Sequence, residues 1–286
     1  MHPGLAWLRA TPEGLRWLDE LPRLVEVCRR RWSLQLGTPY PDSYVSLVLP
    51  AERGGGEPVV LKIQFPGRES QYEADALRVW DGDGAVRLLD HDIERHALLL
   101  ERCVPGTHLR QVPLDEAMDV FVGLLPRIWV PAGAAFTTLA DEAAWWAEDL
   151  GATWERAGRP FERDLLDAAL EALEELPPTQ GEQVLVHQDL HADNVLAAAR
   201  EPWLVIDPKP LLGEREFAAA PIIRSYELGG SRADVRFRFE RLVGDLGLDR
   251  ERTRRWAIAQ TIAWGLDDDG IGDNHLATAR WLLDGF

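Results

Sequence analysis

A group of polar side chains in the second half of the chain has the spacing that phosphoryl transfer needs. His187 and Asp189 are separated by one residue, and Asn194 follows after four others. Asp207 comes thirteen residues after Asn194. Phosphoryl transfer asks a protein mainly for positioning and for neutralisation of phosphate charge. A carboxylate can take the proton of the acceptor hydroxyl, and amide and carboxylate oxygens suit Mg²⁺. We therefore predict that Asp189 is the catalytic base and that Asn194 and Asp207 hold Mg²⁺.

Short apolar runs surround these side chains. Residues 184–186 precede the loop, residues 195–196 follow it, and Asp207 ends the run 204–206. Buried strands that enter and leave a polar loop hold its side chains rigidly, which a functional site requires. The spacing also occurs by chance, so the loop alone leaves open the alternative of an ordinary polar turn.

A single lysine inside an apolar strand supports the first interpretation. Lys62 lies within the run 59–63, and Glu73 follows eleven residues later in a predicted helix. A Lys–Glu pair of this kind directs the ammonium group onto ATP phosphates. Glu69, one helical turn earlier, is the alternative partner. Otherwise Lys62 is a strand-edge residue whose ammonium group extends to water.

The chain changes character near residues 103–106. Before this point we predict a helix over 3–32, strands over 44–49, 58–63, 86–91 and 96–101, and a helix over 69–80. The glycines 54–56 read as a hairpin tip rather than as a phosphate-binding loop. After residues 103–106 we predict helices over 114–176 and from 217 onward, with short strands at 184–186 and 203–206. The fold class is α+β, with a small β-rich N-lobe of residues 1–102 and a larger helical C-lobe of residues 103–286.

Composition limits the possible partners. The 286 residues carry 31 Lys+Arg and 48 Asp+Glu, a net charge of −17, which argues against nucleic acid and anionic membranes as partners. Cys28 and Cys103 are too few for a disulfide framework or a zinc site. No apolar run has the length of a membrane span or a signal peptide. We expect a cytoplasmic protein, either monomer or homodimer.

Taken together, the motifs resemble the aminoglycoside phosphotransferase family, and within it the streptomycin and hydroxyurea kinases. The segments that carry the resemblance are 59–63, 72–92, 97–109, 184–196 and 203–220. The resemblance implies a bilobal protein-kinase-like fold that uses ATP and Mg²⁺. It implies that Lys62 binds the α- and β-phosphates and that Glu73 orients it. The backbone from Glu101 to Cys103 would bind adenine, and His187 would pack beneath the loop.

Two departures from the family pattern affect this prediction. Gln188 stands where the family often has glycine, so its side chain is a candidate for contact with the acceptor. The turn expected to cover the nucleotide, residues 39–43, contains no glycine. Ser43 and the backbone N–H groups of this turn remain candidates for phosphate binding.

The acceptor is expected to bind to the C-lobe. Trp145 and Asp149 on one predicted helix, with Asp267 and Asp268 near the C-terminus, would form aromatic and acidic walls for a cationic ligand. Core packing of the tryptophan and a solvated helix end are the alternatives.

Three basic residues and a second histidine are further candidates for roles near the site. Lys209 is a candidate for phosphate contact or for an ion pair with Asp189, and Arg215 and Arg224 for contact with acceptor or γ-phosphate. His191 is expected to form structural hydrogen bonds rather than to bind metal.

We therefore expect an ATP-dependent phosphotransferase that acts on a hydroxyl of a streptomycin-like aminoglycoside or related amino sugar. A metabolic kinase for a sugar or amino sugar such as glucosamine is the alternative with the same fold. A nucleotide-binding pseudokinase is the alternative of another class.

Overall fold

The chain folds into two compact units whose boundaries do not follow a single cut in the sequence. A computed structural model describes residues 3–41, 43–68, 70–133 and 136–286. One unit comprises Met1–Gly106 and Ala197–Leu204, and the other comprises Thr107–Leu196 and Val205–Phe286. Residues 197–204 thus belong with the N-terminal part of the chain.

The N-terminal unit is built on a five-stranded antiparallel sheet in the order β1-β2-β3-β5-β4. Its strands are β1 (Leu34–Leu36), β2 (Ser46–Arg53), β3 (Glu57–Gln64), β4 (Leu88–Asp92) and β5 (Ala97–Glu101). The predicted strands 58–63 and 96–101 correspond to β3 and β5. The prediction missed β1 and placed β2 about two residues too early, because Tyr44 is exposed and β2 continues through Pro50.

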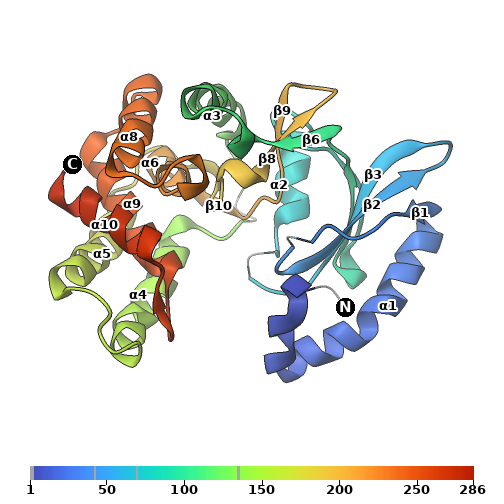
Figure 1. Ribbon diagram of the computed structural model, residues 1–286, viewed down its shortest axis with the longest axis horizontal. Coiled ribbons are helices and arrows are strands. Elements are labelled where there is room, and N and C mark those ends of the chain that lie inside the picture. Colours follow the sequence, from blue (N-terminus) through green and yellow to red (C-terminus); the bar gives the residue numbers. More distant parts are fainter. Residues whose placement is uncertain (1–2, 42, 69, 134–135) are drawn as a thin grey trace. The chain divides into compact units, whose positions relative to one another are not determined.

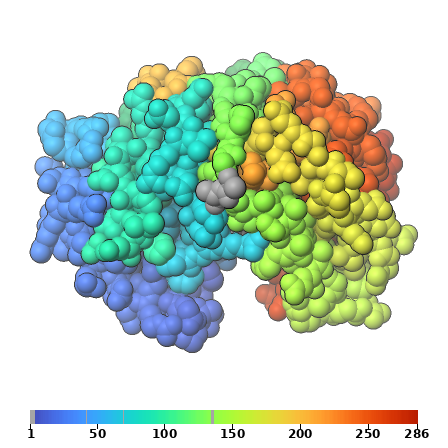
Figure 2. Space-filling view, turned by 180° about the vertical axis from the view of Figure 1, so that it is seen from behind, coloured from blue at the N-terminus to red at the C-terminus, as the bar shows by residue number. Residues whose placement is uncertain are grey.

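The glycine run forms the tip of the β2–β3 hairpin. The two strands pair from Ser46↔Gln64 to Arg53↔Glu57. Gly54, Gly55 and Gly56 all have positive φ, which glycine adopts without the steric cost of a Cβ. The tip lies at the outer edge of the unit, light blue in Figure 2. It is a turn between strands, as the sequence predicted.

The predicted N-terminal helix is interrupted. A 3₁₀ helix, η1 (Pro3–Ala10), precedes α1 (Pro12–Arg31), and the break falls at Thr11. The Thr11 hydroxyl accepts a hydrogen bond from the backbone N–H of Gly14 at 3.1 Å and so caps α1. Pro12 occupies the first turn, where its missing N–H costs nothing. The helix α1 contacts the sheet through β1 and β3 (Figure 1).

The helix predicted over 69–80 is shorter in the structure. Helix α2 (Glu73–Trp80) begins at Glu73, and residues 70–72 form a turn before it. Glu69 lies outside the described residues.

The C-terminal unit is mainly helical. Its longer helices are α3 (Leu114–Ile128), α4 (Leu139–Arg156), α5 (Arg163–Glu175), α8 (Arg232–Leu246), α9 (Arg250–Gly265) and α10 (Asp273–Asp284). Short helices are α6 (Arg215–Ala218) and α7 (Ala220–Ile223). Helix α9 packs against α5, α7 and α10 (Figure 1). Its middle, from Trp256 to Ile262, is buried on all sides, so α9 is the core helix of this unit.

Short strands hold the two ends of the polar loop. β7 (Val184–His187) pairs with β10 (Pro210–Gly213) in antiparallel register, with His187 opposite Pro210. β6 (Pro105–His108), β8 (Val195–Ala198) and β9 (Trp203–Val205) form a second sheet in the order β6-β8-β9. The prediction found β7 and β9 but missed β6, β8 and β10. None of the described helices is long and apolar enough to cross a membrane.

Candidate active site

Lys62 and Glu73 form a buried ion pair in the N-terminal unit. The ammonium Nζ lies 2.6 Å from Glu73 Oε2, and the two side chains are 6% and 2% exposed. The Gln64 amide also donates to Glu73 Oε2 at 2.6 Å. Because β3 is the middle strand of the sheet, Lys62 is not a strand-edge residue that extends to water. The structure thus pairs Lys62 with Glu73, one of the two predicted partners, and the other, Glu69, lies outside the described residues.

The segment 101–103 is held mainly by Glu101. Its carboxylate accepts hydrogen bonds from Arg200 at 2.8 and 2.9 Å, and its N–H donates to the Arg87 carbonyl at 2.9 Å. Burial raises the pKa of Glu101, but the hydrogen bond from Arg200 outweighs it, so the pKa lies below its ordinary value. Cys103 is buried, and burial raises the pKa of its thiol to about 12. Adenine binding by this backbone stays a prediction.

Ser43 belongs to the turn between β1 and β2. Its hydroxyl donates to the Tyr40 carbonyl at 3.3 Å, and the N–H of Tyr40 donates to the Val48 carbonyl at 3.0 Å. Asp42, in the same turn, lies outside the described residues. The hydroxyl therefore closes the turn, and its contact with phosphate stays a prediction.

In the C-terminal unit, His187 joins the two halves of the predicted motif. Its Nδ1 accepts N–H bonds from Asp189 at 3.1 Å and from Lys209 at 3.4 Å. Because a backbone N–H can only donate, Nδ1 is the acceptor and Nε2 carries the proton. Nε2 then donates to the Ile206 carbonyl at 3.4 Å. Burial lowers the pKa of His187 to about 4, which keeps the ring neutral and this tautomer in place.

Two basic residues share the carboxylate of Asp189. Lys209 Nζ lies 2.8 Å from Oδ2, and Arg224 Nη2 lies 3.6 Å from Oδ1. Burial raises the pKa of Asp189, but the charges of Lys209, His191 and Arg224 outweigh it and lower the pKa. Asp189 is therefore ionised at neutral pH and is a weak proton acceptor.

Trp264 at the end of α9 lies against the same two cations. Lys209 Nζ is 5.0 Å from the ring centroid, and the Arg224 guanidinium is 5.2 Å from it. Burial lowers the pKa of Arg224 to about 10. Both side chains are thus held between an aromatic face and a carboxylate. Of the two uses predicted for Lys209, the structure contains the ion pair with Asp189.

Asn194 and Asp207 offer oxygen ligands from adjoining pieces of backbone. The Asn194 amide NH₂ donates a hydrogen bond to the Asp189 carbonyl at 2.8 Å. The amide oxygen Oδ1 is then the side-chain atom that can coordinate a cation. The N–H of Ile206 donates to the Asn194 carbonyl at 2.9 Å. Asp207 has a φ of 52°, an uncommon conformation that costs on the order of 1 kcal/mol and often marks a functional residue. An amide oxygen and a carboxylate fit a hard cation such as Mg²⁺.

Gln188 is buried, only 3% exposed. Its N–H donates to the Lys209 carbonyl at 3.0 Å, and its carbonyl accepts from Gln260 Nε2 at 2.6 Å. This backbone is therefore fixed from both sides, and contact of the side chain with the acceptor stays a prediction.

Two of the predicted acceptor residues, Asp149 and Asp268, meet at Arg156. Its guanidinium binds Asp149 at 3.0 Å and Asp268 at 2.8 Å, although Asp149 and Asp268 lie 119 positions apart in the sequence. The carboxylates are 65% and 71% exposed. Trp145, also on α4, is 53% exposed, so it is not a core residue. With Asp267, in β11 (Leu266–Asp267), we call these residues the acidic cluster.

Sequence reasoning missed three groups that hold the loop: Gln260, Glu227, and the pair His108 and Arg110. His108 contacts the Asp193 carbonyl at 3.0 Å, and Arg110 contacts the Asp193 carboxylate at 3.0 Å. Their distances in sequence from the loop give no local signal. Arg215, a candidate for contact with the acceptor or γ-phosphate, binds Glu182 at 2.8 Å on the surface, and the candidate contact stays a prediction.

Comparison with known proteins shows the family. The family described as aminoglycoside/hydroxyurea antibiotic resistance kinase matches residues 31–270. Streptomycin 6-kinase of Streptomyces griseus is 39% identical over 282 residues, which cover 94% of this chain and 92% of that protein. Hydroxyurea phosphotransferase of Kitasatospora aureofaciens is 38% identical over 280 residues, which cover 94% and 81%.

A solved structure shows the fold. A thermostable mutant of the aminoglycoside phosphotransferase APH(4)-Ia, crystallised with AMP-PNP and hygromycin B, superposes with a TM-score of 0.57. It is 17% identical, and the match covers 93% of this chain and 95% of that one. The predicted α+β, protein-kinase-like fold is confirmed.

Proposed function

Because the chain belongs to the aminoglycoside/hydroxyurea antibiotic resistance kinase family, we propose that it phosphorylates a hydroxyl group of a streptomycin-like aminoglycoside with ATP. The observation that carries the proposal is the loop 187–194. Within this loop the Asp189 carboxylate is flanked by two cations, and the backbone is tied through His187 to the segment that bears Asp207.

Asp189 would orient the acceptor hydroxyl and take its proton. The acceptor oxygen forms a bond to the γ-phosphorus, the bond from that phosphorus to the β,γ-bridging oxygen breaks, and ADP leaves with the bonding electrons. Since the pKa of Asp189 is lowered, its proton transfer belongs late in the step, when the oxygen has become more acidic. Lys209 and Arg224 keep the carboxylate ionised until then.

Asn194 and Asp207 would hold Mg²⁺. Their donor atoms are an amide oxygen and a carboxylate, and the Asn194 amide is already oriented by its bond to the Asp189 carbonyl. Bound there, Mg²⁺ would neutralise charge on the phosphates.

The N-lobe, residues 1–102, would bind the nucleotide. Lys62 would hold the α- and β-phosphates, and Glu73 would fix the direction of its ammonium group. Ser43 and the backbone of Glu101 to Cys103 are the remaining nucleotide contacts in this proposal.

The acidic cluster would bind cationic groups of the acceptor. Asp149 and Asp268 are exposed and carry two negative charges against the one positive charge of Arg156. Asp267 adds a third carboxylate, and Trp145 offers an exposed aromatic face. This surface suits a polycationic aminoglycoside better than hydroxyurea or a neutral sugar.

The test is ADP release from Mg²⁺-ATP with a panel of streptomycin, other aminoglycosides, glucosamine, glucose and hydroxyurea. Stimulation by streptomycin-like acceptors supports the proposal. Stimulation by a monosaccharide or by hydroxyurea alone contradicts it and identifies a different acceptor. Nucleotide binding without transfer to any acceptor contradicts it as well, in favour of a regulatory module.

A further inference from the structure

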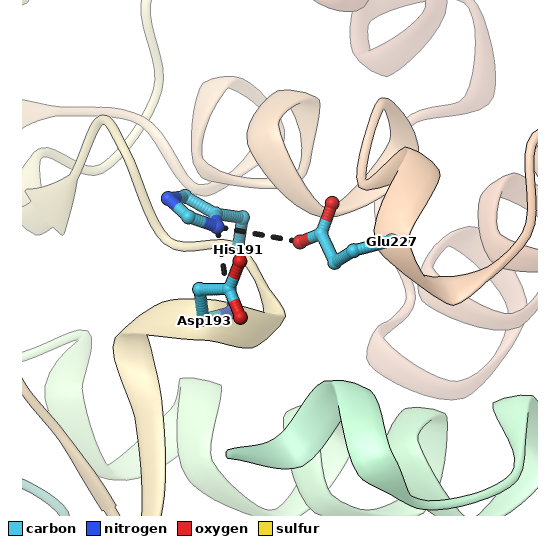
Figure 3. A group of neighbouring side chains, drawn as sticks. All are labelled: His191, Asp193 and Glu227. Atoms are coloured by element: carbon cyan, nitrogen blue, oxygen red, sulfur yellow. Dashed lines mark hydrogen bonds and ion pairs between the residues drawn. The ribbon is translucent and has the colours of Figure 1, made fainter. Parts of the chain in front are cut away.

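Glu227 is a partly buried acid that contacts the middle of the catalytic loop. It lies in the 3₁₀ helix η6 (Tyr226–Leu228), and its side chain is 11% exposed. Its Oε1 accepts the backbone N–H of Ala192 at 2.9 Å and the hydroxyl of Ser225 at 2.9 Å. The same oxygen lies 3.3 Å from His191 Nδ1 (Figure 3).

His191 connects this acid to the proposed base. While Nδ1 faces Glu227, Nε2 lies 4.0 Å from Asp189 Oδ1. Nδ1 is also 3.4 Å from the N–H of Asp193, a contact that requires the neutral ring. Burial lowers the pKa of His191, but the hydrogen bond with Glu227 and the charge of Asp189 outweigh it and raise the pKa. Geometry agrees with this: Nδ1 is nearer to Glu227, at 3.3 Å, than to the Asp193 N–H, at 3.4 Å, and the ring lies between the carboxylates of Glu227 and Asp189.

A metal ion is the other use of these side chains. His191, Asp193 and Glu227 have donor atoms within 4.8 Å of one another (Figure 3). The oxygen of Glu227 nearest the ring already accepts two hydrogen bonds, and Asp193 is paired with Arg110 at 3.0 Å. A cation would have to displace these partners, so the geometry favours a hydrogen-bonded arrangement over a metal site. We call the contacts of Glu227 with His191 and with the Ala192 N–H the bracket.

We propose that Glu227 is a positioning residue for phosphoryl transfer, which acts through His191 and the Ala192 N–H on the loop that carries Asp189 and Asn194. The inference rests on the proposed function. Ala192 lies between Asp189 and Asn194 in the loop, so a bond at its N–H limits the motion of both. Glu227 touches neither substrate nor metal in this account, and its effect reaches the reaction through the loop.

The variant Glu227→Gln tests this directly. It keeps the size of the side chain and an oxygen for the Ala192 N–H, but it loses the charge that holds His191. We expect kcat for streptomycin-dependent ADP release to fall by about 10–100-fold, the effect typical of residues that orient active-site ligands. The KM for ATP should stay within about two-fold, because the nucleotide contacts are intact. Glu174→Gln is the matched control, since Glu174 is exposed on α5, and it should behave as wild type.

A second variant keeps the test decisive if Glu227→Gln does not fold. His191→Gln leaves the bond between Glu227 and Ala192 in place and should lower kcat by a similar factor. If both single variants fold, the double variant should be no worse than the poorer single one, because residues that act as one unit are not additive. Wild-type kcat in either variant, or multiplied effects in the double variant, would overturn the inference.

Amide hydrogen exchange separates this inference from the proposed function. If wild-type protein transfers phosphate to none of the acceptors, the proposed function fails, and exchange at residues 189–194 then decides about Glu227. Faster exchange there in Glu227→Gln, with the rest of the chain unchanged, supports the bracket. Unchanged exchange overturns it.

Discussion

At the scale of the residue, we expect the ion pair of Lys62 and Glu73 to orient the lysine ammonium group rather than to stabilise the fold. Removing one partner of a buried ion pair leaves an uncompensated charge and typically costs about 3–5 kcal/mol. Replacing both partners by neutral groups often costs little. The pair is therefore expected to be retained for the position it gives the ammonium group.

We predict that Lys62→Met and Glu73→Gln each destabilise the protein and that the double variant recovers most of the loss. Urea unfolding measures the free energy of unfolding, and calorimetric titration with Mg²⁺-ATP measures binding. The double variant should fold well but bind ATP at least about 10-fold more weakly. Wild-type ATP affinity in the double variant would contradict the role given to Lys62.

His187 gives a prediction for pH. Burial lowers its pKa from 6.5 to about 4 in the folded protein. Between pH 4 and pH 6.5 the unfolded chain binds a proton at His187 that the folded protein does not bind. The contribution of His187 to the free energy of unfolding is therefore complete above pH 6.5 and is lost as the pH falls toward 4. From pH 7 to pH 5 the loss should be about 2 kcal/mol.

Urea unfolding of wild type and His187→Asn at both pH values isolates this effect. The raised pKa of His191 acts in the opposite direction, but it is common to both proteins and cancels in the difference. The wild type should lose about 2 kcal/mol more than the variant on acidification. Equal losses would show that His187 is not held neutral in the folded protein.

Local patterns were enough to propose the reactive residues of the site, whose roles stay predictions, but they did not predict the residues that hold the loop. The spacing of Asp189, Asn194 and Asp207 is a property of a short stretch of chain, and it could be read directly. Glu227 contacts the loop from 35 residues away, and Gln260 from 72. Contacts between distant residues depend on how helices pack, and no spacing rule contains that information.

At the scale of the element, apolar runs and turn chemistry predicted β3, β5 and the glycine hairpin, whereas several of the short strands were missed. β8 and β10 have four residues each, and β1 has three. Segments of this length owe their structure to pairing with neighbours more than to their own pattern. The break between η1 and α1 had a local signal in Thr11 and Pro12, which the apolar periodicity of the flanking residues obscured.

The hairpin yields a prediction at this scale. Since Gly54–Gly56 form a tip between paired strands, replacing them with the two-residue turn Asn-Gly should keep the hairpin and leave the KM for ATP within about two-fold. Steady-state kinetics with varied ATP measure this. A large rise in KM, with the melting temperature unchanged, would indicate that the tip binds the nucleotide phosphates.

At the scale of the whole molecule, the net charge of −17 gains a functional meaning only if the acceptor is cationic. Attraction between exposed charges is screened by salt, with a Debye length of about 10 Å at 0.1 M and about 3 Å at 1 M. The KM for streptomycin should therefore rise several-fold between about 0.05 and 0.5 M KCl, while kcat changes little.

The acidic cluster provides the matched comparison. Asp268→Asn should raise the KM for streptomycin by about 2–5-fold at low salt and reduce its dependence on salt, since one exposed pair contributes about 1 kcal/mol or less. Asp284→Asn removes the same charge at the C-terminal end of α10 and should leave both unchanged. An equal effect of the two variants would mean that overall charge, rather than the cluster, attracts the acceptor.

The most direct test of the account is transfer of the labelled γ-phosphate of ATP to streptomycin by wild type and by Asp189→Asn. The account predicts labelled streptomycin with the wild type and a rate lower by about 10²–10⁴ with the variant, whose neutral amide has the same shape but cannot accept the proton. Both proteins should bind Mg²⁺-ATP. Labelling by the variant at nearly the wild-type rate would contradict the role of Asp189, and a wild type that binds ATP but leaves streptomycin unlabelled would contradict the proposed acceptor.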